Sequence, residues 1–182
     1  MFTGLNVSFL PQQDCYGDLS SVLTAAGQIT APRFLVAFAD NLYPDANPLH
    51  SLHHAQDDGP ALLARPFTIA EAHRRGVIIA PVRDGHRYVM DIAEKPDPAE
   101  ALALLSRWGQ DNLYVVEGRF LLTSHFLASI DQNRCRAAGE PKLSLALGHY
   151  AQSHPVAVVT TTSRVVDLAS HQPQSDLLGV AQ

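Results

Sequence analysis

Apolar and polar segments alternate along the whole chain. Short apolar runs bounded by polar residues predict strands at 5–10, 33–39, 112–117 and 156–162. Apolar residues at helical spacing predict helices over 19–29, 97–108, 123–133 and 142–152. Within 76–96 two further strands are expected around Asp84-Gly85, a dipeptide typical of tight hairpins. This alternation predicts a three-layer α/β fold with a mostly parallel sheet.

Two of these segments have informative ends. The run 33–39 (RFLVAFA) is nearly continuous in apolar residues, as in a buried parallel strand, and Asp40 follows it directly. Because ligands of open α/β sheets gather at the carboxyl ends of strands, Asp40 is a candidate site residue. The helix at 97–108 is expected to begin with Asp97 as its cap and Pro98 at its first position.

Length and composition narrow the class of protein. The 182 residues are most simply one domain, residues 1–170, followed by a polar tail at 171–182. A net charge of −5 argues against binding to nucleic acid or to an anionic membrane, and no apolar stretch reaches the length of a membrane span. Cys15 and Cys135 are far apart, which favours two reduced thiols. Since 1–6 lacks the features of a signal peptide, a cytoplasmic protein is predicted.

The first candidate for chemistry is Glu94-Lys95-Pro96, which follows an apolar strand and precedes a helix. At such a corner a carboxylate can accept hydrogen bonds from sugar hydroxyls, and an ammonium group can neutralise a phosphate. The same pair would also be unremarkable as solvated surface charges, so its context matters.

That context is an ordered set of motifs. After EKP come NLYVVEGRFLL at 112–122, GEPKLSLA at 139–146 and RVVDLA at 164–169. In this order they resemble the sugar-1-phosphate nucleotidylyltransferases, most closely the bacterial UTP–glucose-1-phosphate uridylyltransferases. The resemblance extends over roughly 5–170 and implies a Rossmann-like, nucleotide-diphospho-sugar transferase fold.

The resemblance also implies roles for particular residues. Lys95 would pair with the phosphate of the sugar 1-phosphate, and Asp40 and Asp167 would hold Mg²⁺, which prefers oxygen ligands. A sugar phosphate oxygen would attack the α-phosphorus of UTP, and pyrophosphate would leave. Lys95 and Asp40 are the expected catalytic residues; the remaining expected substrate contacts are Glu94, Gly118 and Glu140 for sugar hydroxyls and Gln12 for the nucleotide base.

The sequence departs from the family on the nucleotide side. No G-x-G occurs in it, whereas the family opens with a Gly-rich loop whose N–H groups cradle the nucleotide phosphates. Leu19 stands where a glycine would let the base approach, and Leu145 and Ala169 replace an Asp and a Gly. We therefore expect transfer by this chain alone to be impaired. The alternative is a non-catalytic sugar-phosphate-binding or regulatory partner of a full-length relative.

The same departures suggest a partner. Without the first strands of the family fold, an apolar sheet edge would be exposed, and such edges pair with other chains. A homodimer, or a partner chain that covers the edge, is the resulting hypothesis.

Two further patterns are weaker. His50, His53 and His54 could hold a metal from one helix face, although ordinary surface histidines are the simpler interpretation. Thr123-Ser124-His125 contains an adjacent Ser/His pair, but adjacent residues rarely form a nucleophile–base pair, and a helix cap is expected there.

Overall fold

The computed structural model describes residues 6–13, 15–53, 55 and 58–168. Their main feature is a six-stranded sheet around one long central strand, β8 (Leu113–Thr123). Along one edge of β8 runs β3 (Ala61–Pro66), followed by β11 (Ala157–Thr160). The other edge carries both β1 (Arg33–Ala37) and β4 (Gly76–Ile79), and β7 (Asp91–Glu94) lies outside β4.

Strand direction explains why this sheet is mixed. β8 is antiparallel to β1, β3 and β4, and β11 is parallel to β3. In the part of the chain that the structure describes, β1, β3, β4 and β11 therefore share one direction, and β7 and β8 run the other way. The predicted α/β fold class is confirmed. Most strands run in one direction, as expected for a mostly parallel sheet. However, β8 lies between them and runs in the opposite direction, so most of the ladders are antiparallel.

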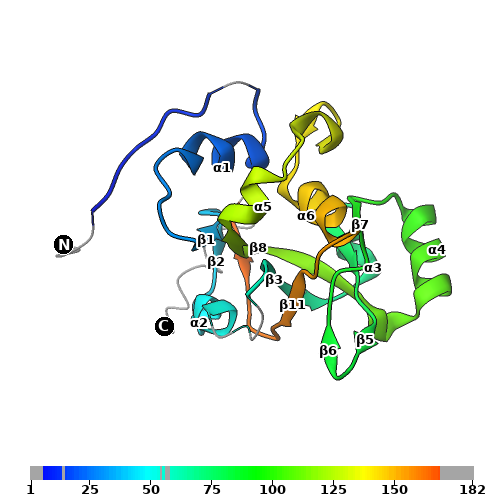
Figure 1. The fold of residues 1–182 in the computed structure, drawn as a ribbon. Helices are drawn as coiled ribbons and strands as arrows, with labels where there is room; N and C mark the ends of the chain where they lie inside the picture. The colour runs from blue at the N-terminus through cyan, green and yellow to red at the C-terminus, as the bar shows by residue number, and fades with distance from the viewer. Residues whose placement is uncertain (1–5, 14, 54, 56–57, 169–182) are drawn as a thin grey trace, which may run out of the picture.

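Helices cover both faces of the sheet and give the predicted three layers (Figure 1). On one face α1 (Asp18–Ala26), α5 (Ser124–Ala128) and α6 (Leu143–Ala151) pack on alternate β8 side chains such as Val116, Phe120 and Leu122. On the opposite face α3 (Ile69–Ala72) and α4 (Pro98–Trp108) pack over Leu113 and Val115, and α2 (Pro48–His53) packs over Leu121. Because successive side chains of a strand point to opposite faces, β8 contributes residues to the hydrophobic cores on both faces of the sheet.

Three short ladders complete the secondary structure. They pair β2 (Asn41–Leu42) with β12 (Val166–Asp167), β5 (Val82–Arg83) with β6 (His86–Arg87), and β9 (Arg136–Ala137) with β10 (Glu140–Pro141). Single 3-10 turns lie at Gln110–Asn112 and Gln132–Arg134. The β5–β6 hairpin turns at Asp84 and Gly85, both with positive φ, as the sequence predicted.

The break between β1 and β4 positions the site. The last β1 pair joins Ala37 to Arg119, and the first β4 pair joins Val77 to Val115. β1 therefore ends and β4 begins on the same edge of β8, and Glu117 and Gly118 face the gap between them.

Local expectations met mixed outcomes. The helix at 97–108 is confirmed as α4, with Pro98 first and Asp97 as its cap in a complete capping box with Glu100. The strand expected at 5–10 is wrong for the described residues 6–10, which are exposed and form no ladder. The helix expected near 123–133 ends at Ala128.

The strand expected to be buried at 33–39 is β1, and that burial is wrong. Its residues are half-buried or exposed, and Leu35 is 41% exposed. Within the described ranges only β8 pairs with β1, so its outer edge stands open. The partner hypothesised for such an edge stays a prediction. Among the described residues no helix is long and apolar enough to cross a membrane, and the expected tail at 171–182 lies outside them.

Candidate functional site

A cleft of about 260 Å³ opens at the break between β1 and β4. Charged side chains of both signs line it together with the backbone of β8 and β4. Its charged residues are Asp18, Asp40, Arg74, Arg75, Glu94, Lys95, Lys142 and Asp167. The structure thus brings together Asp40, Glu94, Lys95, Gly118 and Asp167, which the sequence had selected from four separate segments.

Lys95 lies at the corner just after β7. Its backbone has φ +48°, a conformation that costs free energy for a residue other than glycine. The Lys95 N–H donates to the Arg75 carbonyl at 3.3 Å, which places these two residues side by side. The side chain is exposed, and the interactions found among the described residues include no ion pair or hydrogen bond for its ammonium group. That charge is available to a ligand.

Glu94 is held from two sides. The Ser144 hydroxyl donates to Oε2 of Glu94 at 2.6 Å. On the other side Glu94 pairs with Gly76 across the β4–β7 ladder, and a Cβ on Gly76 would lie 3.1 Å from the same oxygen. Oε1 of Glu94 has no bonding partner among those found in the described part of the chain. Ser144, which the sequence did not single out, therefore orients this carboxylate.

Asp167 is the last residue of β12, and Asp40 directly precedes β2, its partner strand. Asp167 pairs with Asn41, and the Leu168 N–H donates to the Asp40 carbonyl at 2.8 Å. Buried Arg119 fixes this segment, because its guanidinium donates to the carbonyl of Phe38 at 2.7 Å and to that of Asn41. The two carboxylates are thus placed at one wall of the cleft by contacts that no local sequence pattern reveals.

Gly118 lines the cleft. The sequence suggested that the strand ends before this glycine, but β8 continues to Thr123. A Cβ on Gly118 would lie 2.3 Å from Nδ2 of Asn41 and 3.1 Å from the Phe38 ring, and its φ is +29°. The chain's own Asn41 side chain occupies the space beside this glycine. Its packing therefore explains the glycine without reference to a ligand.

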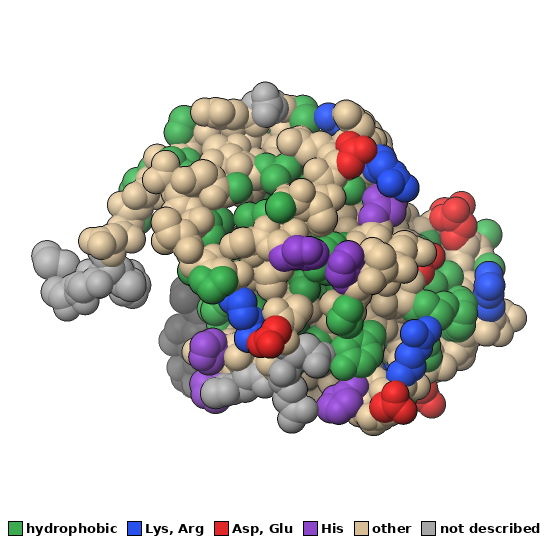
Figure 2. All heavy atoms as spheres, in the orientation of Figure 1, with side chains coloured by type: hydrophobic (Ala, Val, Ile, Leu, Met, Phe, Trp, Pro, Cys, Tyr) green, Lys and Arg blue, Asp and Glu red, His purple; other side chains and the backbone are tan. Residues whose placement is uncertain are grey.

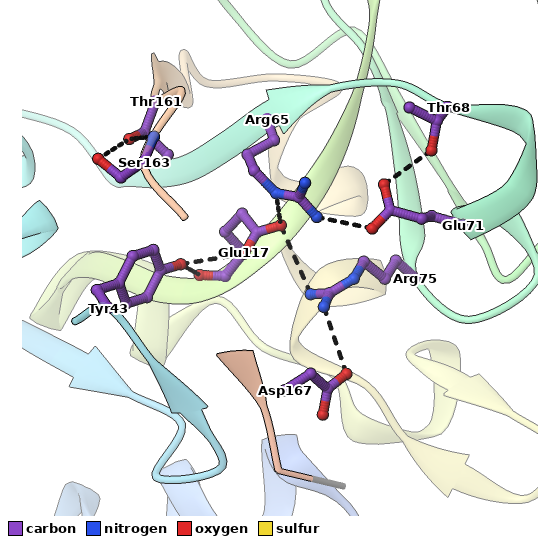
Figure 3. Close-up of polar contacts among 9 residues, drawn as sticks. All are labelled: Tyr43, Arg65, Thr68, Glu71, Arg75, Glu117, Thr161, Ser163 and Asp167. Carbon is purple, nitrogen blue, oxygen red and sulfur yellow. Dashed lines mark hydrogen bonds and ion pairs between the residues drawn. The ribbon is translucent and has the colours of Figure 1, made fainter. Parts of the chain in front are cut away.

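Two cleft cations were missed by the sequence reasoning. Arg74 and Arg75 follow α3 and precede β4, and no motif marks them. Arg75 belongs to a network around Glu117, a carboxylate with no exposed surface on β8 (Figure 3). Elsewhere, positive and negative side chains are scattered over the face in Figure 2 and form no continuous basic surface there.

A larger groove, about 860 Å³, lies between α1 and β1 and meets the cleft at Asp18, Asp40, Lys95 and Lys142. Gln12 lines it, and its amide group donates to the Gly17 carbonyl at 3.1 Å and accepts from Ser21 at 2.9 Å. These bonds fix Gln12 against the start of α1.

Glu140 lies in the larger groove and not among the residues of the cleft. Its Oε2 is 2.5 Å from Nζ of Lys142, and this hydrogen bond lowers the pKa of the Glu140 carboxyl. For Lys142, burial alone would lower the pKa, but the bond to Glu140 and the charge of Asp18 outweigh it and raise the pKa. Both groups are charged at neutral pH, and the contact of Glu140 with a sugar stays a prediction.

Leu19 and its neighbour Asp18 lie differently from what the resemblance suggested for Leu19. Leu19 is fully buried in the core and does not line the larger groove. Asp18 faces both hollows, and its Oδ1 accepts from the Leu143 N–H at the start of α6 at 2.7 Å. Burial raises the pKa of the Asp18 carboxyl, although this hydrogen bond opposes the shift.

The weaker sequence patterns have plain structural roles. Thr123 caps α5 by accepting from the Phe126 N–H at 3.1 Å, as predicted for the Thr-Ser-His segment. His50 and His53 lie in α2, whereas His54 is outside the described residues. No cluster of three possible metal-ligating side chains occurs among the residues that the structure describes.

The mixed α/β fold of this chain is similar to that of solved sugar-1-phosphate nucleotidyltransferases. A UDP-glucose pyrophosphorylase complexed with UDP-glucose superposes with a TM-score of 0.71 at 22% identity, over 90% of this chain and 61% of that one. UDP-glucose pyrophosphorylase from Acinetobacter baumannii follows with a TM-score of 0.66 at 17% identity, over 88% and 54%. A putative glucose-1-phosphate thymidylyltransferase from Bacillus anthracis has a TM-score of 0.61 at 19% identity, over 87% and 58%.

These likenesses establish the fold, and the chain spans about 60% of the length of the first structures it matches. No protein-family model matches the sequence, and no curated protein does.

Proposed function

We propose that the cleft binds a sugar 1-phosphate, and that the chain serves nucleotidyl transfer to that sugar phosphate in the manner of a UTP–glucose-1-phosphate uridylyltransferase. The observation that carries the proposal is the pairing of Lys95, whose ammonium is available, with the oriented carboxylate of Glu94 in one small cleft. An ammonium group and a carboxylate side by side match the two ends of a sugar phosphate, its anion and its hydroxyls.

Three charged cleft residues would bind the sugar 1-phosphate in this proposal. Lys95 neutralises the phosphate, and Arg74 adds positive charge at the same wall. Glu94 accepts hydrogen bonds from sugar hydroxyls through the oxygen that Ser144 leaves open. In the transfer step a phosphate oxygen of the sugar forms a bond to the α-phosphorus of UTP, and the bond from that phosphorus to pyrophosphate breaks. Positioning and charge neutralisation would supply the catalysis.

Magnesium fits the donor set at Asp40 and Asp167. Mg²⁺ is typically held by one or two carboxylates together with substrate phosphates and waters, so two neighbouring aspartates suffice without a third protein ligand. When bound there, the ion would neutralise phosphate charge at the junction of cleft and groove.

The nucleotide would lie in the larger groove, where Gln12 is the candidate contact for the base. A Gly-rich loop that donates N–H groups to the triphosphate does not occur in this sequence. Turnover by the chain alone is therefore expected to be slow or absent. The second candidate function, a non-catalytic sugar-phosphate-binding or regulatory partner, is favoured by this same feature.

A binding experiment tests the first part of the proposal, that the cleft binds a sugar 1-phosphate. Isothermal titration with glucose 1-phosphate should give saturable binding to the wild-type chain and binding at least about tenfold weaker in Lys95→Gln, since a charge-assisted contact is lost. Arg83→Gln is the matched control, because it removes an exposed cation from the β5–β6 hairpin, away from the cleft. Absence of binding to the wild type, or equal affinity in Lys95→Gln, would refute the proposal.

Pyrophosphate release from UTP and glucose 1-phosphate with Mg²⁺ separates the two candidate functions. Release that disappears in Asp40→Asn supports a transferase. Binding of glucose 1-phosphate without any release supports the non-catalytic partner.

A further inference from the structure

A connected set of ion pairs lies beneath the cleft, around Glu117 (Figure 3). Oε1 of Glu117 is 2.6 Å from Nε of Arg65, whose Nη2 is in turn 2.8 Å from Oε1 of Glu71. The Tyr43 hydroxyl donates to Oε2 of Glu117 at 3.1 Å. Burial, followed by the charge of Glu117, raises the pKa of this hydroxyl well above its ordinary value, so it remains a donor. Glu117, which has no exposed surface, and Arg65, which is partly buried, thus form the most closely bonded pair of the network.

Arg75 contacts this pair and Asp167 over longer distances. Its Nη1 lies 3.6 Å from the same Oε1 of Glu117 that Arg65 already holds, and its Nη2 lies 3.3 Å from Oδ2 of Asp167. Because two guanidinium groups share one carboxylate oxygen, Glu117 offsets the charge of Arg75 only in part. Asp167 supplies the remaining counter-charge from the cleft side.

The ion pair between Arg75 and Asp167 lies at the cleft, where the proposed ligand would bind. Arg75 and Asp167 both line the cleft, and their side chains are 13% and 30% exposed. A backbone hydrogen bond joins Lys95 to Arg75, and both residues line the same cleft, where Lys95 is proposed to meet the phosphate. A guanidinium that Glu117 holds in place from behind can present two parallel N–H groups to a phosphate.

We propose that Arg75 is a second phosphate-binding residue of the cleft, and that a bound phosphate replaces Asp167 as its partner. The inference rests on the proposed function, since it assigns the anion subsite of the same cleft. Asp167 pairs with a largely buried cation that would otherwise lack a full counter-charge. A phosphate monoester carries more negative charge than a carboxylate and fits the fork of the guanidinium, so it competes well for the same nitrogen atoms.

The exchange makes Asp167 a competitor of the ligand, which yields an unusual expectation for its variant. Asp167→Asn removes the competing charge and should bind phosphate more tightly than the wild type in the absence of divalent cations. A purely structural role for the Arg75–Asp167 pair would instead leave affinity unchanged or lower it.

The experiment is titration calorimetry with inorganic phosphate and with glucose 1-phosphate, without divalent cations, at fixed low ionic strength. Arg75→Gln should weaken binding of both ligands by roughly tenfold or more, as expected for loss of charge-assisted hydrogen bonds. Arg75→Lys keeps the charge but not the fork, and should recover part of the loss. Asp167→Asn should tighten binding about threefold or more, corresponding to a modest screened charge interaction.

Asp40→Asn is the matched control, because it also removes one negative charge from the cleft wall but no Asp40–Arg75 contact is found in the structure. The inference is overturned if Asp167→Asn binds phosphate no more tightly than Asp40→Asn, or if Arg75→Gln binds like the wild type. Should Arg75→Gln fail to fold, the Asp167 and Asp40 comparison decides by itself.

The outcomes also separate this inference from the proposed function. Glucose 1-phosphate binding that depends on Lys95 but responds to neither Arg75 nor Asp167 overturns the exchange and leaves the proposed function standing. Inorganic phosphate binding with the expected variant order, combined with no preference for glucose 1-phosphate, supports the exchange and contradicts the sugar phosphate. If neither ligand binds the wild type, both proposals are refuted.

Discussion

Replacing Gly118 by alanine should destabilise the protein severely, and the structure gives the reason in two parts. The first is backbone strain, since φ at Gly118 is +29°, where side chains with a Cβ are disfavoured. The second is a collision, because the new Cβ would lie 2.3 Å from Nδ2 of Asn41, well inside van der Waals contact. Strain of this kind costs about 1–3 kcal/mol, and overpacking a filled site costs about as much again.

We therefore expect Gly118→Ala to lose roughly 2–6 kcal/mol of unfolding free energy. Urea denaturation followed by the fluorescence of Trp108, the single tryptophan, measures this loss from the shift in midpoint at unchanged slope. Gly85→Ala is the matched control. Gly85 also has positive φ, +81°, but open space around its missing Cβ, so only the strain of roughly 1–2 kcal/mol should appear.

A double-mutant cycle isolates the collision. In an Asn41→Ala background the Nδ2 atom is gone, and Gly118→Ala should cost about 1–3 kcal/mol less than in the wild type. If Gly118→Ala costs no more than Gly85→Ala, or costs the same in both backgrounds, then Asn41 does not occupy the space beside Gly118, and our explanation of this glycine is wrong.

Three further predictions concern single contacts. Glu117→Gln should lower stability by about 3–5 kcal/mol in urea denaturation, since it removes the charge of a fully buried carboxylate that faces partly buried arginines. Glu71→Gln, at the more exposed end of the same network, should cost about 1 kcal/mol or less, and equal losses would contradict the proposed burial effect. Iodoacetamide at pH 7.5 should modify Cys15 before Cys135. The hydrogen bond with Ser20 and the nearby Arg136 lower the pKa of the Cys15 thiol, whereas burial raises the pKa of the Cys135 thiol. Peptide mass mapping over time would show the order of labelling, and faster labelling of Cys135 would contradict the prediction. Asp97→Ala should cost about 1 kcal/mol in thermal or urea unfolding by removing the cap of α4, and Asp97→Asn should restore most of it; a neutral Asp97→Ala would mean that the capping box contributes nothing.

Elements with strong local signals were predictable from the sequence. Asp97-Pro98 sets the start of α4, because the aspartate satisfies free N–H groups and proline is pre-organised for a first helical turn. Asp84-Gly85 sets the β5–β6 turn because its conformation requires positive φ. The order of the motifs led to the fold that the solved structures share.

Predictions that depended on strand neighbours failed. The run 33–39 is as apolar as a buried strand, but β1 is half-exposed because nothing among the described residues pairs with its outer edge. β8 passes through Gly118 and continues to Thr123 because β1 and β3 supply backbone partners on both its edges there. A glycine ends a strand only where such partners are lacking.

The sequence by itself determined the α/β class, the caps and turns, and the choice of Asp40, Glu94, Lys95 and Asp167 as one candidate set. Those features rest on side chains interacting with their own backbone within a few residues, or on an ordered pattern of motifs. Only the tertiary structure decided that Arg75 stands beside Lys95, that Ser144 orients Glu94, and that Asp167 pairs with Arg75. These contacts join residues 20 to 92 positions apart in the chain, and they form only where β4, β7, α6 and β12 come together in the folded structure.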